Sequence, residues 1–496
     1  QTVHGDSVGR TMFAIEVQVV GDDGIAFVEI QAARQSGMAR IDVTLADREG
    51  ETVQNIKAWL SAPARDWVVV GFGKGTIGYD RLSGAEQIAR GQRNETVTDG
   101  QLSLYAQGRI KGTWLLTLAY DSDKDRERMR ERGALGTIDP DRYYTVYGDG
   151  TLRGHDAASR RKLYLRLERR EFYALYGDFE TGLVDTRLAR YSRTMSGAKA
   201  EYMANRLHVT IFSASEDNRY GRDEIQGNGL TGPYRLSARD LVPNSDKLSI
   251  EVRDCFRPDR ILDSRQLARH IDYDIDPLAG TIRFREPILS RNVDLNPIFI
   301  VVDYETFGSN RRPVAGGRVA AKIGPAEIGA SLIHDETLGQ ATVAGLDVRA
   351  KISATTEVRA EAAHGGRNGL NSGEAWLAEI EHHGPRADVL TYVREQARDF
   401  GLGQQNLGEA GMRKIGTDGR VKLSDRWYLA GSLWHQQDLD DDIRRVAGDI
   451  KIESRRAAGT LYAGARFASD RGTSGAGRDS RLLTLGGTQN LLDNRL

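Results

Sequence analysis

The chain has 496 residues, a net charge of −1 from 69 basic and 70 acidic side chains, and a mean hydropathy of −0.49. The charges are interspersed, which argues against a nucleic-acid partner, and no run approaches the roughly 18 apolar residues of a membrane helix. A transmembrane β-barrel is not excluded by such averages, because half of each spanning strand is polar.

The first segment, residues 1–66, alternates apolar and polar side chains at Phe13–Val20 and Ile25–Gln31. It lacks the small-residue apolar face of the later strands. We expect a small N-terminal β-domain, immunoglobulin-like and on the periplasmic side. The chain starts at Gln1 and ends without a terminal aromatic residue, so we expect the natural chain to be longer.

A different pattern begins at Trp67, where segments long enough to cross a bilayer as tilted strands follow in pairs. In one of them Leu163, Leu165 and Leu167 face one way, and Tyr164, Arg166 and Glu168 face the other. Aromatic residues near strand ends (Tyr120, Tyr176, Phe179, Trp427 and Trp434) are typical of interface girdles. The strands expected in this first barrel section, residues 67–220, are 67–79, 101–109, 112–121, 162–169, 172–179, 196–204 and 206–215.

Residues 221–312 interrupt the pattern, because they hold six of the eleven prolines of the chain. Proline removes donors from a β-ladder, so this stretch is poor material for a closed barrel wall. Its strands at Lys247–Val252, Thr281–Phe284 and Ile298–Tyr304 predict an inserted β-domain.

The paired pattern resumes in a second barrel section, residues 313–496, and is most regular between Leu346 and Ala362. Even positions there are mostly alanine, valine and leucine, and odd positions are mostly charged, which favours lipid outside and water inside. The strands expected are 316–323, 327–334, 341–352, 357–364, 373–381, 387–397, 408–416, 426–436, 444–454, 458–468 and 480–490. The side chains predicted to face the lumen are Asp347, Arg349, Lys351, Glu357, Arg359, Glu361, Glu379, Glu381 and Arg394.

These segments predict an all-β protein, a transmembrane antiparallel β-barrel of about 18 or more strands. Tight connections such as 324–327 and 383–386 alternate with long ones such as 180–195 and 398–407. Short periplasmic turns and long outer loops are the usual asymmetry, so the insert is expected on the outer side. The mixed lumen charges indicate a hydrated interior braced by ion pairs, unless the interior is plugged.

A repeated phrase links the chain to known proteins. Tyr144-Thr-Val-Tyr-Gly-Asp-Gly is followed by Phe172-Tyr-Ala-Leu-Tyr-Gly-Asp-Phe, and similar glycine- and tyrosine-rich phrases surround them. Over roughly residues 60–310 the sequence resembles a family of large Gram-negative outer-membrane proteins whose barrels follow immunoglobulin-like repeats. Asp272–Phe284 and Phe299–Glu305 also resemble inserts of the translocon barrel of type IX secretion. Neither resemblance supplies a catalytic residue.

Motifs of catalysis or cofactor binding are weak. Gly71-Phe-Gly-Lys-Gly-Thr lacks the spacing of a phosphate loop. Asp272, Asp274 and Asp276 begin like a calcium loop, but Pro277 and Arg283 stand where glycine and glutamate belong, which leaves a looser calcium site or a solvated turn. The adjacent His382 and His383 diverge, and the single cysteine, Cys255, excludes disulfides and cysteine-based zinc sites. We predict no enzyme activity, no cofactor and no resident metal.

The sequence therefore favours an outer-membrane barrel of a Gram-negative bacterium that acts as a channel, a secretion component or a surface anchor. A surface adhesin or assembly subunit, whose insert at 221–312 binds a protein partner, is an alternative, and so is a soluble multidomain β-protein. The expected partners are the lipid bilayer and lipopolysaccharide. The acidic run Asp438, Asp440, Asp441 and Asp442 is a candidate for binding the divalent ions that bridge lipopolysaccharide, or else a solvated loop tip.

Overall fold

The fold was determined from a computed structural model. It describes residues 2–7, 11–16, 37–47, 50–60, 67–79, 96–111, 113–122, 144–145, 152–153 and 162–489, with short gaps at 243–244, 255–259, 293–295, 309, 339, 367–371, 406, 442, 457–458 and 473–476. Cys255, Asp442 and the strand expected at Ile25–Gln31 lie outside the described residues. Within them, no helix is long and apolar enough to cross a membrane.

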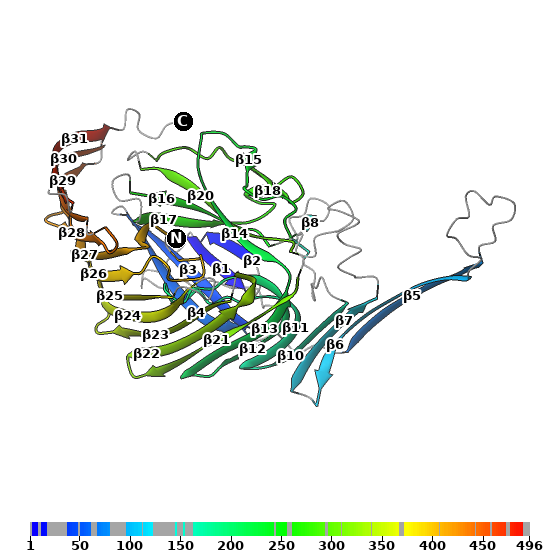
Figure 1. The fold of residues 1–496 in the computed structure, drawn as a ribbon. Helices are drawn as coiled ribbons and strands as arrows, with labels where there is room; N and C mark the ends of the chain where they lie inside the picture. The colour runs from blue at the N-terminus through cyan, green and yellow to red at the C-terminus, as the bar shows by residue number, and fades with distance from the viewer. Residues whose placement is uncertain are drawn as a thin grey trace.

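Eighteen antiparallel strands form one sheet that is rolled into a barrel (Figure 1). Neighbouring strands from β5 to β31 pair in continuous register. The barrel closes where β31 lies next to β5, and the described residues of these two strands show no continuous register. The wall strands, in order, are β5 (Val68–Tyr79), β6 (Thr96–Ile110), β7 (Trp114–Asp121), β10 (Leu163–Arg169), β11 (Phe172–Glu180), β12 (Thr194–Met203), β13 (Leu207–Glu216), β21 (Arg312–Ile323), β22 (Ala326–Asp335), β23 (Ala341–Lys351), β24 (Thr356–Gly366), β25 (Gly373–His383), β26 (Ala387–Gln396), β27 (Met412–Lys422), β28 (Trp427–Asp438), β29 (Arg444–Arg456), β30 (Gly459–Arg471) and β31 (Gly477–Gln489).

The predicted number of wall strands and their pairing are confirmed. So is the alternation of connections, because every hairpin at one end of the barrel closes with a turn of two to four residues and the longer loops lie at the other end. One strand was misplaced. The segment expected at 408–416 is strand β27, Met412–Lys422, because the 3₁₀-helix η2 (Leu407–Glu409) and a turn at Gly411 precede it.

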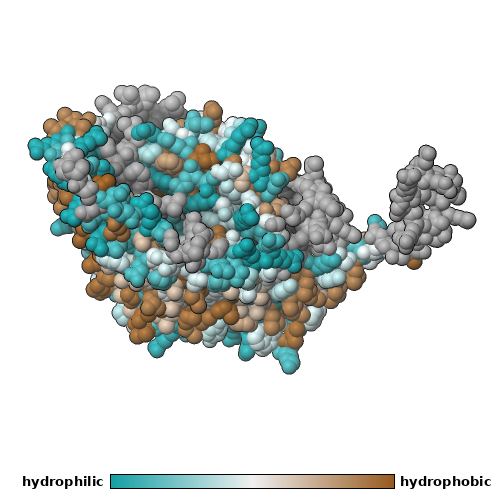
Figure 2. Space-filling view, viewed as in Figure 1, coloured by the Kyte–Doolittle hydropathy of each residue, from teal (hydrophilic) through white to brown (hydrophobic). Residues whose placement is uncertain are grey.

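Apolar side chains cover the outside of the wall. Leu346 is 66% exposed and Leu332 is 59% exposed, whereas the alternate residue Val343 is fully buried inside. Figure 2 shows hydrophobic residues gathered on the lower part of the wall, beneath a hydrophilic upper region. Two residues of the expected aromatic girdle are exceptions, since Phe179 and Trp434 point inward and are buried. A soluble multidomain protein would bury this aliphatic surface, so that alternative is wrong.

Residues between β13 and β21 form two small sheets at the long-loop end of the barrel (Figure 1). The first has the order β14-β20-β16-β17 and the second β15-β19-β18, and they share an apolar core around Ile282 and Ile300. Their strands are β14 (Arg219–Gln226), β15 (Tyr234–Arg235), β16 (Lys247–Arg253), β17 (Ile261–Leu267), β18 (Tyr273–Asp276), β19 (Thr281–Phe284) and β20 (Ile298–Thr306). We call residues 219–306 the insert. The exact domain boundaries remain predictions.

Three smaller features complete the described fold. A four-stranded antiparallel sheet has the order β2-β1-β3-β4, and its immunoglobulin-like character remains a prediction. Its strands are β1 (Thr2–Ser7), β2 (Thr11–Glu16), β3 (Gly37–Asp47) and β4 (Gly50–Leu60). A short pair joins β8 (Tyr144–Thr145) to β9 (Leu152–Arg153), and the 3₁₀-helix η1 (Glu336–Leu338) follows β22.

Part of the barrel interior is a packed hydrophobic core. It combines inward side chains of β10–β13 and β21–β25 with residues of two loops, 181–193 and 397–411. Val314, Ile333 and Val343 from the wall are fully buried in it, as are Tyr191 and Leu402 from the loops. The interior is therefore not hydrated throughout. On this side of the barrel, loops fill the long-loop end.

Candidate functional site

The loop of residues 181–193, between β11 and β12, folds into the barrel. Its base continues the hairpin, with reciprocal backbone hydrogen bonds between Leu183 and Tyr191 of 3.0 and 2.7 Å. Gly182 adopts φ +69°, a left-handed conformation that residues with a side chain rarely take, where the chain leaves the strand. Leu183, Leu188 and Tyr191 are buried in the core, so apolar burial drives the loop inward. We call residues 181–193 the inner loop.

The tip of the inner loop is held by carboxylates on the opposite wall. Glu361 on β24 accepts hydrogen bonds from the backbone N–H groups of Arg187 (2.9 Å) and Leu188 (2.9 Å). The Arg187 guanidinium donates to Glu379 on β25 at 2.8 Å, and Arg394 on β26 binds the same carboxylate at 2.6 Å. Five wall strands separate β12 from β25, so these contacts cross the interior.

A second loop, 397–411, secures the inner loop by side-chain amides. Gln404 accepts from the backbone N–H of Ser192 at 2.7 Å and donates to its carbonyl at 3.1 Å. Gln405 donates to the carbonyl of Leu188 at 3.0 Å, and its oxygen accepts from the N–H of Leu402 at 2.9 Å. These amides satisfy backbone groups that would otherwise be buried without partners.

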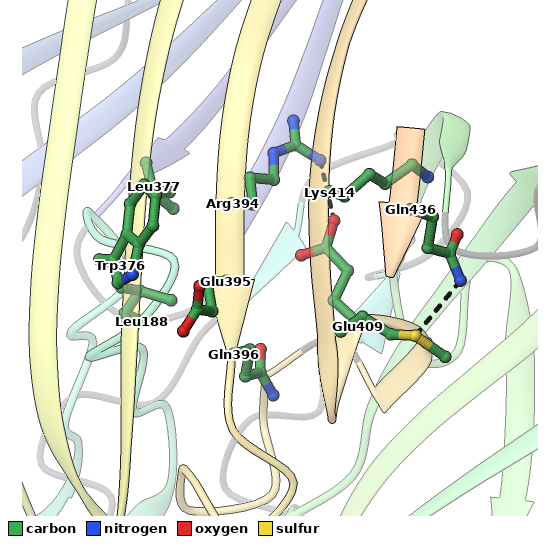
Figure 3. A pocket seen from close by; sticks show the side chains of 11 residues that line it. Leu188, Trp376, Leu377, Arg394, Glu395, Gln396, Glu409, Lys414 and Gln436 are labelled. Atoms are coloured by element: carbon green, nitrogen blue, oxygen red, sulfur yellow. Dashed lines mark hydrogen bonds and ion pairs between the residues drawn. The ribbon is translucent and has the colours of Figure 1, made fainter. Parts of the chain in front are cut away.

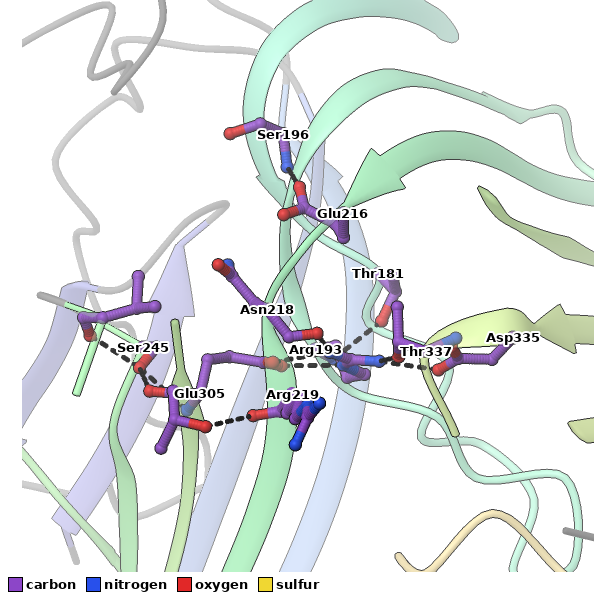
Figure 4. Close-up of polar contacts among 12 residues, drawn as sticks. Thr181, Arg193, Ser196, Glu216, Asn218, Arg219, Ser245, Glu305, Asp335 and Thr337 are labelled. Atoms are coloured by element: carbon purple, nitrogen blue, oxygen red, sulfur yellow. Dashed lines mark hydrogen bonds and ion pairs between the residues drawn. The ribbon is translucent and has the colours of Figure 1, made fainter. Parts of the chain in front are cut away.

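The base of the inner loop carries a buried arginine that joins three parts of the protein (Figure 4). Arg193 donates to Glu305 on β20 of the insert, to Asp335 at the end of β22 (2.6 Å), and to the hydroxyl of Thr337 (2.7 Å). Burial opposes its charge, but Glu305 and Asp335 outweigh that penalty and hold the pKa of Arg193 well above its ordinary value. Burial raises the pKa of Tyr191, which donates to Asp335 at 2.6 Å.

The insert has two further contacts with the barrel. Lys247 on β16 binds Glu180 at the end of β11 and donates to Ser192 of the inner loop at 2.7 Å. Arg260 lies 3.5 Å from Asp418 on the inner face of β27. The insert is therefore held at the long-loop mouth by Lys247, and through Arg260 it also contacts the inner face of β27 past the middle of that strand.

Little space remains between the tip of the inner loop and the wall beside it. A cavity of about 10 Å³ lies next to Leu188, bordered by Leu377, Arg394 and Lys414 (Figure 3). That volume is near the lower limit for one water molecule. Arg394 is fixed there by Glu409, with an Nη1–Oε1 distance of 2.8 Å. The tip of the inner loop is thus packed tightly against this part of the wall.

The side chains predicted to face the lumen lie on one face of β23–β26, opposite the exposed aliphatic residues, and they fall into two groups. Asp347, Glu361, Glu379 and Arg394 are packed near the inner loop, where Asp347 binds Arg318 of β21 at 2.8 Å. The others lie nearer the turn end and are more exposed. In that group Arg349 binds Glu357 at 2.7 Å, Arg359 lies 3.9 Å from the same carboxylate, Glu381 lies 3.0 Å from His383, and Lys351 is exposed.

Comparisons with known proteins add only a weak likeness. No protein-family model and no curated protein matches the chain. Among solved structures, OccK11 (OpdR) of Pseudomonas aeruginosa is 10% identical with a TM-score of 0.32, over 85% of this chain and 94% of that one. OccK5 (OpdH) of the same organism is 8% identical with a TM-score of 0.33, over 86% and 98%. OccAB3 of Acinetobacter baumannii is 9% identical with a TM-score of 0.30, over 86% and 98%.

Likenesses with scores this low carry no argument about this chain. The location follows from the chain's own features. The chain forms a rolled antiparallel sheet with an aliphatic exterior and a polar, partly filled interior. It has short turns at one end and long loops at the other. Proteins of the Gram-negative outer membrane have this architecture. The chain is a transmembrane β-barrel of that membrane.

Sequence reasoning missed the inner loop, which it treated as a long polar connection. A signal was present, because five of its residues (Leu183, Val184, Leu188, Ala189 and Tyr191) are apolar or aromatic. It also missed Ala341, Val343 and Ala363, which are apolar residues at odd positions of an otherwise charged face. Together these positions mark where the wall meets a packed loop instead of water.

The acidic groups considered for cations are engaged separately. Asp272 accepts from the N–H of Ala268, Asp274 binds Arg285 at 2.9 Å, and Asp276 accepts from the N–H of Leu278. Asp438 accepts from the N–H groups of Asp440 and Asp441, and Arg398 binds Asp440. Among the residues described, no three acidic, histidine or cysteine side chains are arranged to hold a metal ion.

Proposed function

We propose that this protein is an outer-membrane channel whose path is narrowed by the inner loop. The observation that carries the proposal is the attachment of the loop tip to Glu361 and Glu379 across the interior. A loop fixed in this way reduces the cross-section of an 18-strand barrel, which would otherwise be wide enough for a large aqueous pore. Charged side chains near the turn end give the remaining path a polar lining.

Planar-bilayer recordings test this function. Wild-type protein should give discrete conductance steps. A variant in which residues 184–190 are replaced by two glycines keeps the Leu183–Tyr191 bridge and should conduct several-fold more current. A matched control exchanges Ser424-Asp425, in a turn at the other end, for Asn-Gly and should conduct like the wild type. Absence of conductance from both the wild type and the shortened variant, with heat-modifiable gel mobility intact, would contradict the channel.

Surface attachment through the insert remains the alternative function. Deleting the insert, residues 219–306, separates the two functions, because an adhesin would lose binding to its partner with the barrel still folded, whereas a channel would keep or increase its conductance. Arg193 and Lys247 tie the insert to the mouth of the barrel, so the insert is placed to influence passage, which favours the channel.

A further inference from the structure

Basic side chains lie beside outward-facing aromatic rings at the short-turn end of the wall. Three turns that follow one another along this rim join β6 to β7, β10 to β11 and β12 to β13, at residues 110–114, 169–172 and 203–207. Lys111, Arg169 and Arg206, one from each of these turns, are exposed. We call these three residues the basic turn patch.

Arg169 faces the lipid side of the wall and stacks on an aromatic ring. It has the same orientation on β10 as Leu165, which is 38% exposed, whereas the alternate residue Glu168 is buried inside. The guanidinium carbon of Arg169 lies 5.4 Å from the centroid of the Trp114 ring on β7. Trp114 makes an edge contact with Phe172, the register partner of Arg169, with ring centroids 6.0 Å apart. Contact with a ring restrains the long cationic side chain on the outer face.

The aromatic rings form a row along the outer face at this end. Tyr202 on β12 is the register partner of Phe172 and is 38% exposed, so the row reaches from β7 to β12. Rows of aromatic side chains mark the boundary between hydrocarbon and lipid headgroups. Figure 2 shows hydrophilic residues at the lower edge, beneath the hydrophobic band of the wall. Arg169 and the turns beyond it therefore lie at the height of the headgroups.

Lys111 stands where glycine would fit more easily. Its φ is +49°, in the left-handed region that side chains disfavour. The turn itself does not need a lysine, so the charge at this position points to a role outside the fold. Adjacent strands are about 4.8 Å apart, which places turns of neighbouring hairpins roughly 10 Å apart. Long side chains on turns at that spacing can reach the same lipid headgroup or adjacent ones.

We propose that the basic turn patch binds the phosphate groups of anionic phospholipids in the leaflet around the turn end. A guanidinium matches two phosphate oxygens, and lysine adds a point charge. The aromatic row provides contacts for acyl chains, which a free phosphate ion does not have. A zwitterionic phospholipid brings its own cation, which opposes binding to three basic side chains, so the preferred lipid is anionic. The patch lies outside the barrel, and its role does not depend on conduction.

Spin-labelled lipids in phosphatidylcholine vesicles that contain the full chain test the patch. Labelled phosphatidylglycerol should associate with the wild type several-fold more strongly than labelled phosphatidylcholine. A triple variant with Lys111→Gly, Arg169→Gln and Arg206→Gln should lose most of this preference. The matched control is Lys322→Gln, because Lys322 is an exposed cation at the same rim that faces the interior, opposite Glu327. The control should keep the preference of the wild type.

Lys111→Gly alone relieves the backbone conformation of the turn and removes one charge, so it should fold and should lower the preference in part. It decides the question if the triple variant does not show heat-modifiable gel mobility. A wild type without preference for phosphatidylglycerol, or folded variants that keep the full preference, would overturn the proposal. An equal loss in Lys322→Gln would also overturn it, because the preference would then follow the total charge. Displacement of the labelled lipid by millimolar inorganic phosphate would show an ion site and contradict a lipid site.

Discussion

Arg193 binds Glu305 at two points, with an Nε–Oε1 distance of 2.7 Å and an Nη2–Oε2 distance of 2.5 Å. Both side chains are buried, although one belongs to the inner loop and the other to the insert. The same guanidinium reaches Asp335 of the wall. One residue therefore joins the inner loop, the insert and the barrel, and changes at this joint should be transmitted to all three.

Replacing Arg193 with methionine should detach the insert from the inner loop. The change leaves Glu305 and Asp335 buried without their shared cation, and breaking such a pair from one side destabilises a protein by about 3–5 kcal/mol. Limited proteolysis should then cut the insert faster, and urea should unfold it at lower concentration. The control is Arg413→Met, which removes an exposed ion pair with Glu395 and should leave the stability nearly unchanged, because exposed ion pairs contribute little. If both variants were equally sensitive to protease and urea, Arg193 would not be what joins the insert to the inner loop.

Replacing Glu361 with alanine should release the tip of the inner loop. The backbone N–H groups of Arg187 and Leu188 lose their acceptor, at about 1–3 kcal/mol for each group left buried. Single-channel recordings should show larger or noisier conductance than the wild type. Glu381→Ala, on the same face of the neighbouring strand β25 and paired with His383 at 3.0 Å, is the matched control. If the control alters conductance as much, the tip contacts do not set the width.

The wall was predictable because its information is local. A period of two residues, as between Leu346 and Ala362, fixes which side chains face lipid without reference to any other strand. The turns follow from glycine and proline at 324–325 and 384–385. Counting such segments therefore gave the strand number and the side on which the insert leaves the wall.

The position of the inner loop was not predictable because its contacts are long-range. Leu188 meets Gln405 across 217 positions, and Arg193 meets Glu305 across 112. No periodicity shows which glutamate on a charged strand face will accept hydrogen bonds from backbone N–H groups. The sequence therefore placed Glu361 on the inner face of the wall but did not predict its contact with the inner loop. Arg420 and Glu453 likewise come together only through the register of β27–β29.

Replacing Leu346 with arginine should weaken the barrel in lipid but not its ability to fold in detergent. Leu346 lies near the middle of β23 on the exposed face, where an arginine facing hydrocarbon costs about 2–4 kcal/mol. Ile352→Arg, beyond the turn end of the same strand, should cost about 0–1 kcal/mol because it reaches the interface. The measurement is urea-induced unfolding in vesicles. Similar costs at both positions would place the bilayer elsewhere on the wall.

Acidification should strengthen the joint between the insert and the inner loop. Burial raises the pKa of Glu305 above the ordinary value of 4.5, and although Arg193 opposes the shift, the neighbouring Glu216 and Asp335 add to it. Glu305 and Asp335 share Arg193, and Glu216 is a third buried carboxylate nearby, so the folded joint takes up a proton more readily than the unfolded chain. Stability from this group is fully present below the ordinary glutamate pKa and is lost as pH rises through the higher pKa of the folded state.

The difference in unfolding free energy between the wild type and Glu305→Gln isolates this contribution from that of other carboxylates. This difference in free energy should fall as pH rises from about 4.5 to the folded-state pKa of Glu305, because the wild type loses the proton on Glu305 over that range. The variant does not change over that range at this position, because glutamine cannot titrate. Urea titrations at a series of pH values measure it. A flat difference would mean that Arg193 keeps Glu305 ionised in the folded state throughout. A rising difference would mean that the ion pair with Arg193 outweighs burial, and the insert would then loosen on acidification instead of tightening.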